Sequence, residues 1–172
     1  MQAEELRALQ APLKTRYRED PESALLTLHA DGKLDGTAIT CHVATPHGAV
    51  EAGLHPATGG SGSEACSGDM LLQALVACAG VTLRAVATAL GIEIRGGRVH
   101  AEGDLDFRGT LGVSKEAPVG FKEIRLRFEL DTPAGEEQLA SLLKLTERYC
   151  VVYQTLRQPP PVEVSMNGGS LS

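Results

Sequence analysis

Residues 70–83 read Met70-Leu-Leu-Gln-Ala-Leu-Val-Ala-Cys-Ala-Gly-Val-Thr-Leu83, which is the longest apolar run in the chain. Ser67 can cap a helix that begins there, Asp69 places negative charge in its positive first turn, and Gly91 can end it. A helix over 67–90 has no continuous polar face, so it must be packed on most sides. The apolar run itself is too short to cross a bilayer, which favours a buried core helix.

Composition limits the class of protein. The chain has 172 residues, of which 42% are hydrophobic but only 3% aromatic, so we expect one domain with an aliphatic core. A net charge of −6 argues against nucleic acid and anionic membranes as partners. The acidic N-terminus lacks the apolar segment of a signal peptide. We therefore expect a protein of the reducing cytoplasm, in which a structural disulfide scaffold is not expected.

Before the apolar helix, the sequence predicts an N-terminal arm and a hairpin lobe. We expect an arm or short helix over residues 1–20, with helix only as far as Pro12. Residues 23–29 and 36–44 are strand-like, with a turn at Asp31-Gly32 and a competing turn at Asp35-Gly36. The hairpin lobe spans 21–66 and ends in a Gly-, Ser- and Pro-rich loop over 46–68.

After the apolar helix, the sequence predicts strands, a helix and a final strand. Residues 92–107 form a strand interrupted at Gly96-Gly97, and residues 122–130 alternate strictly between apolar and charged side chains. A helix follows over 134–149 after Thr132, and residues 150–156 either continue it or begin a new one. Pro159 stops this helix, and residues 162–166 form a last short strand. The lobe from the central helix to residue 166 completes an α+β domain spanning 21–172.

Four cysteines are the main candidates for chemistry. Cys78 and Cys150 lie in apolar, helix-like surroundings, where thiols are either inert packing or two halves of a thiol–disulfide cycle. Cys66 precedes the start of the central helix, where the helix dipole can lower its pKa; it is either a reactive or resolving thiol or an incidental loop residue. Cys41 faces one side of a strand and is expected to pack.

Metal and phosphate sites are not expected. His42, His47 and His55 cluster in sequence without the spacing of a metal-ligand motif. Gly59-Gly60-Ser-Gly62 lacks the Lys-Ser/Thr of a phosphate-binding loop and is interpreted as flexible connection.

Three segments in order resemble the family of osmotically inducible protein C (OsmC) and organic hydroperoxide resistance protein (Ohr). They are the apolar helix with Ala77-Cys78 at its middle, the strand over 99–106, and residues 121–130 followed by a helix and Cys150. The resemblance covers about residues 20–166. It implies an α+β fold in which a long buried central helix is wrapped by antiparallel β-sheet, within an intertwined homodimer.

The resemblance also implies an activity, namely thiol-dependent reduction of hydroperoxides in oxidative-stress defence. Cys78 would attack the peroxide, Cys150 would resolve it as a disulfide, and a dithiol would re-reduce the pair without metal or organic cofactor. The sequence departs from the family pattern at three places. Val151 follows Cys150 where proline is usual, the place of a helix-start Glu falls on Gly68 with Asp69 next to it, and the first hairpin has no Arg.

A buried thiol needs a nearby group that stabilises its thiolate form. A free thiol has a pKa of about 8.5, burial raises it, and the helix dipole fades before Cys78. A cation is therefore expected from Arg16, Arg18, Lys33 or Arg148, and we favour Lys33 or an N-terminal Arg such as Arg18, either of the same chain or of a partner chain. The alternative is a non-catalytic dimer of the same fold that binds a small ligand in its apolar cleft, with both thiols as packing.

Overall fold

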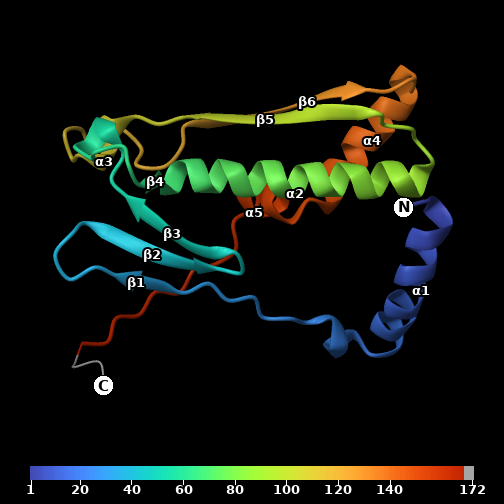
Figure 1. Ribbon diagram of the computed structural model, residues 1–172, viewed down its shortest axis with the longest axis horizontal. Helices are drawn as coiled ribbons and strands as arrows, with labels where there is room; N and C mark the ends of the chain where they lie inside the picture. The colour runs from blue at the N-terminus through green and yellow to red at the C-terminus, as the bar shows by residue number, and fades with distance from the viewer. Residues whose placement is uncertain (169–172) are drawn as a thin grey trace.

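The structure is a computed structural model that describes residues 1–168, and it confirms the α+β class (Figure 1). Its elements in chain order are α1 (Ala3–Glu19), the 3-10 turn η1 (Pro21–Ala24), β1 (Gly32–Leu34), β2 (Thr40–Thr45), β3 (Gly48–Gly53), the 3-10 turn η2 (Pro56–Thr58), β4 (Ala65–Cys66), α2 (Ser67–Leu90), β5 (Gly96–Asp104), α3 (Phe107–Thr110), β6 (Glu123–Asp131), α4 (Glu136–Tyr149) and α5 (Val151–Arg157). One sheet has the order β1-β2-β3-β4, and β5 and β6 form the other.

The central helix α2 has the predicted bounds. Cys66 rather than Ser67 occupies the N-cap, and Gly91 ends the helix with a φ of 69°, a left-handed conformation that glycine adopts without strain. One stripe of α2 is buried, and it consists of Leu75, Ala79, Leu83 and Ala87. By length and composition α2 could cross a membrane, but it packs against α4, β5 and α5 as the core helix of the domain.

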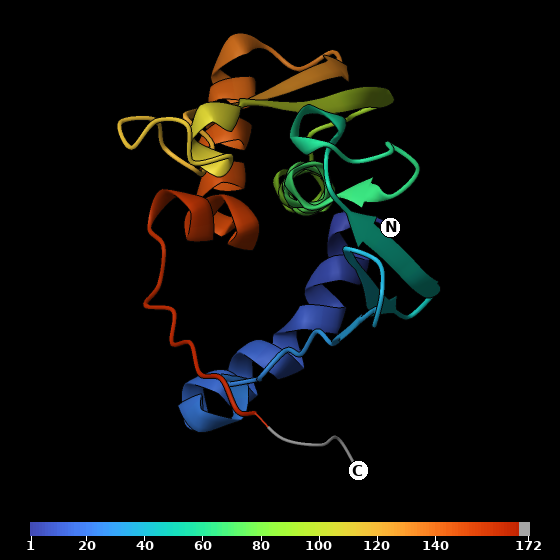
Figure 2. The same ribbon diagram turned by 90° about the vertical axis from the view of Figure 1, so that its left-hand side faces the viewer.

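The sheet of β5 and β6 covers one side of α2. The two strands pair antiparallel from Gly96↔Asp131 to Asp104↔Glu123. The predicted alternation in β6 is confirmed, because its apolar residues are partly buried while most of the charged residues between them are exposed. Helix α4 adds Leu142 and Thr146, both buried, to the core formed with Leu83 and Ile92. Figure 2, in which α2 is seen nearly end on, shows α4 and α5 on one side of it and the hairpin strands on the other.

Two of the predicted strands are wrong. Residues 23–29 form η1 and then irregular chain, and residues 162–166 form no strand. Both segments are apolar enough for a strand. A strand needs a neighbouring strand to bond its backbone groups, and within residues 1–168 neither segment pairs with a sheet edge. Their leucine and valine side chains are accordingly exposed, with Leu28 at 90% of its full accessible surface.

The hairpin is built from different segments than the sequence indicated. β1 begins at Gly32, where a turn was expected, and the competing turn at Asp35 joins it to β2. The Asp35 carboxylate accepts the N–H groups of Thr37 (2.7 Å) and Ala38 (2.9 Å), which fixes that turn. Strand β3 was missed within the predicted loop, because its Gly- and Ala-rich sequence has no strand signal and its form depends on pairing with β2.

Helix α1 continues to Glu19, so the predicted end at Pro12 is wrong. Proline removes one backbone hydrogen bond inside the helix. The surface of α1 is accessible, so the unpaired carbonyl can be hydrated and the helix need not break. The first turn is fixed by the Glu5 carboxylate, which accepts the N–H of Gln2 at 2.8 Å.

Candidate functional site

The fold brings Cys78 and Cys150 together. Cys78 lies on α2 and is half-buried, whereas Cys150 lies at the junction of α4 and α5 and is 1% exposed. Each thiol affects the pKa of the other, so the two lie close together, and both are in the reduced form.

The two thiols have pKa shifts of opposite sign. Burial raises the pKa of Cys78, but hydrogen bonds from the backbone of Val152, the Cys150 thiol and the backbone of Val151 together lower it below its ordinary value. Burial also raises the pKa of Cys150, and its hydrogen bond to the Cys78 sulfur raises it further against a lowering contribution from the Tyr153 backbone. Of the two thiols, Cys78 is therefore the one that loses its proton more readily.

The break between α4 and α5 supplies the donors. Cys150 has extended backbone angles (φ −75°, ψ 108°), so α5 is a new helix rather than a continuation of α4. The first N–H groups of a helix have no partner within it, and here those of Val151 and Val152 lower the pKa of Cys78. The side-chain amide of Gln154 donates to the Glu147 carbonyl at 2.7 Å, which ties α5 to the end of α4.

The other predicted site residues lie apart from this pair within one chain. Asp69 is exposed in the first turn of α2, and the nine residues to Cys78 turn about half a circle and advance about 13 Å. Lys33 is exposed on β1, and Arg18 is exposed in the last turn of α1. Within residues 1–168, the groups with the strongest effect on the Cys78 pKa include no charged side chain. In the single chain, backbone N–H groups are among the groups that lower the Cys78 pKa, and the expected cation stays a prediction.

The remaining cysteines have separate surroundings. Cys66 is half-buried at the N-cap of α2, where β4 pairs with β3 through Gly53. Cys41 on β2 packs over Gly32, since a Cβ placed on that glycine would lie 2.7 Å from the Cys41 sulfur. In the part of the chain that the structure describes, no group of three His, Cys, Asp or Glu side chains could hold a metal ion.

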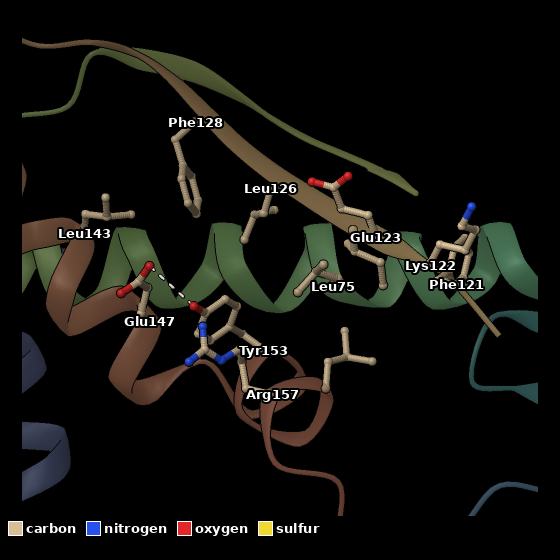
Figure 3. A pocket seen from close by; sticks show the side chains of 12 residues that line it. Leu75, Phe121, Lys122, Glu123, Leu126, Phe128, Leu143, Glu147, Tyr153 and Arg157 are labelled. Atoms are coloured by element: carbon tan, nitrogen blue, oxygen red, sulfur yellow. Dashed lines mark hydrogen bonds between the residues drawn. The ribbon is translucent and has the colours of Figure 1, made fainter. Parts of the chain in front are cut away.

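A cavity of about 430 Å³ lies between α2, β6, α4 and α5 (Figure 3). Its apolar wall consists of Leu75, Phe121, Ile124, Leu126, Phe128, Leu143 and Leu156, and its polar rim of Lys122, Glu123, Glu147, Tyr153 and Arg157. The Tyr153 hydroxyl donates to the Glu147 carboxylate at 3.4 Å. Leu75 lies one turn from Cys78, and Glu147 and Tyr153 lie three residues on either side of Cys150. None of these lining residues was among the site candidates from the sequence, although their spacing from the two cysteines was visible there.

Thr82 offers a test of the hydrogen bonds that act on Cys78. Its hydroxyl lowers the pKa of Cys78, so Thr82→Val is expected to raise it. Because the thiolate is the reactive form, the rise in Cys78 alkylation by iodoacetamide should then occur at higher pH than in the unaltered protein. Thr88→Val is the matched control, because the Thr88 hydroxyl bonds to the Arg84 carbonyl on the same helix. Identical pH profiles for Thr82→Val and the unaltered protein would refute this role.

Comparison with known proteins adds to this geometry. Residues 60–165 match the OsmC-like protein family. Among solved structures, the chain is similar to an OsmC-like protein from Mycoplasma pneumoniae (17% identity, 78% of this chain and 89% of that chain, TM-score 0.65). It is also similar to organic hydroperoxide resistance proteins from Legionella pneumophila (20% identity, 78% and 91%, TM-score 0.61) and Elizabethkingia anophelis (18% identity, 78% and 91%, TM-score 0.63).

No curated protein matches the sequence. The structural neighbours share the fold at low identity, and the family match extends over more than half of the chain. The chain belongs to the OsmC-like protein family.

Proposed function

We propose that this protein reduces organic hydroperoxides, with Cys78 as the attacking thiolate and Cys150 as the resolving thiol. The observation that carries the proposal is that the two thiols lie close together and have pKa shifts of opposite sign, which supports Cys78 as the attacking thiol and Cys150 as the resolving thiol. The names of the Legionella and Elizabethkingia neighbours, organic hydroperoxide resistance proteins, agree with this chemistry.

The reaction proceeds in two balanced steps. The Cys78 thiolate attacks one oxygen of the peroxide, the O–O bond breaks, and the alcohol leaves after taking a proton, so Cys78 becomes a sulfenic acid. The Cys150 sulfur then attacks the sulfenic sulfur, and its proton leaves with the hydroxyl group as water. The two thiols have supplied two electrons and form a disulfide, which a dithiol reductant reduces in the cytoplasm.

The apolar wall of the cavity suits the organic group of such a peroxide. It includes Leu75, which lies one helical turn from Cys78, and the polar rim includes Glu147 and Tyr153, which lie three residues on either side of Cys150. The same cavity also supports the second candidate function, in which the protein binds a small apolar ligand without turnover and the thiols only pack.

Thiol counting distinguishes the two functions. Cumene hydroperoxide at modest excess is expected to remove two of the four free thiols per chain, which is measured with a thiol reagent under denaturing conditions. Retention of all four thiols would refute the peroxidase and favour the ligand-binding protein.

A homodimer is the second part of the proposal. The chain has 13237 Å² of accessible surface, whereas a compact monomer of 18.1 kDa exposes about 8,100 Å². Part of the excess lies on the face of α2 opposite its buried stripe, made of Leu71, Ala74, Ala77, Val81 and Ala85. Small apolar side chains of this kind allow a second helix to approach closely, so we assign this face to a second copy of the chain. That copy would also bring Lys33, Arg18 or Asp69 to the thiols.

Charge on the exposed face of α2 should dissociate the dimer. Val81 lies near the middle of this face and is 73% exposed in the single chain. Val81→Glu is therefore expected to give a monomer in sedimentation velocity, because the buried carboxylate would have no partner. Ser141→Glu introduces the same charge on the exposed side of α4 and should leave the dimer intact. A dimeric Val81→Glu protein would show that this face is not the interface.

A further inference from the structure

The N-terminal 31 residues contact the rest of the chain mainly at the end of α2 and extend away from the core of the domain. Helix α1, the segment 20–31 and the β1–β3 hairpin lie on the side of α2 opposite to β5 and β6 (Figure 1). The N-terminal end of α1 shares a groove with the end of α2 and the residues after it, and the main contacts of α1 are with α2 and η1. From there the chain crosses to β1 as an irregular segment.

The side chains of this part are apolar and uncovered. Helix α1 has no buried residue, and its Leu9 is 63% exposed. Leu13 lies one turn further along the same face, and the irregular segment adds exposed Leu25, Leu26 and Leu28. A helix of 17 residues with a central proline and no buried face is marginal in water by itself. This stretch therefore requires something to pack against.

A second copy of the chain is the occupant that fits. The exposed face of α2 lies opposite its buried stripe, because Val81 lies about 200° around the helix from the buried Ala79. Helix α1 and the segment 20–31 likewise lie on the side of α2 away from β5 and β6 (Figure 1). A copy seated on α2 would therefore lie among these leucines. The surface excess of about 5,000 Å² per chain is also more than one helix face can bury, so the interface must extend to further elements.

We propose that residues 1–31 form a clasp that closes over the partner copy, with Leu9, Leu13, Leu25, Leu26 and Leu28 buried against it. This inference rests on the proposed homodimer. Residues 1–31 precede the part of the chain that matches the family. The contacts of the clasp with the partner copy would therefore add to the dimer contacts made by the matching part.

The test is the dissociation constant of the dimer for the full chain carrying Leu9→Ser and Leu13→Ser. Sedimentation over a dilution series is expected to show a dissociation constant about 100-fold higher, because both leucines lose their burial. Ala11→Ser is the control and should have no effect, since Ala11 is on the opposite face of α1. Neither leucine is buried in the single chain, so the double variant keeps its fold, which circular dichroism checks.

The outcomes separate the clasp from the dimer. A dimer that Val81→Glu disrupts but Leu9→Ser/Leu13→Ser leaves within twofold would overturn the clasp alone. A monomeric unaltered protein would overturn both. Hydrogen exchange provides a second measurement, in which amides of α1 should be protected above the dissociation constant and exchange rapidly below it. Protection that is independent of protein concentration, or that appears only with lipid vesicles, would also overturn the clasp.

Discussion

Replacing Cys78 with serine is expected to abolish the reduction of cumene hydroperoxide, with kcat/KM falling by at least about 1,000-fold. Serine keeps the size and hydrogen bonding of the side chain but cannot provide a thiolate at neutral pH. The measurement is peroxide consumption in the presence of excess dithiol reductant, together with the count of thiols lost. Cys41→Ser is the matched control, because Cys41 packs over Gly32 away from the pair, and it should retain full activity.

One outcome of the Cys78→Ser experiment would contradict the assignment of Cys78 as the attacking thiol. If peroxide still removed two thiols per chain from this variant, the attacking thiol would be another cysteine. Cys66 is then the first candidate, since it is half-buried at the start of α2 and has a free thiol.

Replacing Cys150 with serine should stop the cycle after its first step. Peroxide is expected to remove only one thiol per chain, and Cys78 should accumulate as a sulfenic acid that dimedone traps and mass spectrometry locates. Turnover with the dithiol should fall by about 100-fold, because the reductant must reach a half-buried sulfenic acid instead of a disulfide. Cys66→Ser is the control. A Cys150→Ser protein that turns over normally and forms a Cys78–Cys66 disulfide would assign resolution to Cys66.

The two cysteines could be selected from sequence, but the reason for their different acidity could not. Sequence analysis left residues 150–156 as either a new helix or a continuation of the preceding one. In a continuous helix, the N–H groups of Val151 and Val152 would bond to carbonyls one turn back. The break at Cys150 frees them for the Cys78 sulfur, and this break depends on how α4 and α5 pack on α2.

The same contrast applies to the fold. Helix α2 was predicted closely from its long apolar run and the residues at its two ends, and strand β6 from its strict alternation of apolar and charged residues. Residues 23–29 and 162–166 have comparable apolar patterns, but their outcome depends on a partner edge that the single chain does not offer. β3 has no pattern of its own and forms because β2 is next to it. Elements with a clear signal in their own residues were therefore predicted from the sequence. Segments that form a strand only when a neighbouring strand is available were not.

The most direct measurement is the disulfide connectivity after one equivalent of cumene hydroperoxide, read by mass spectrometry of peptides from the unreduced, thiol-blocked protein. The account predicts a single linkage between Cys78 and Cys150, with Cys41 and Cys66 recovered as blocked thiols. Recovery of Cys78 and Cys150 as blocked thiols, or a linkage of Cys78 to Cys66 or Cys41, would contradict it.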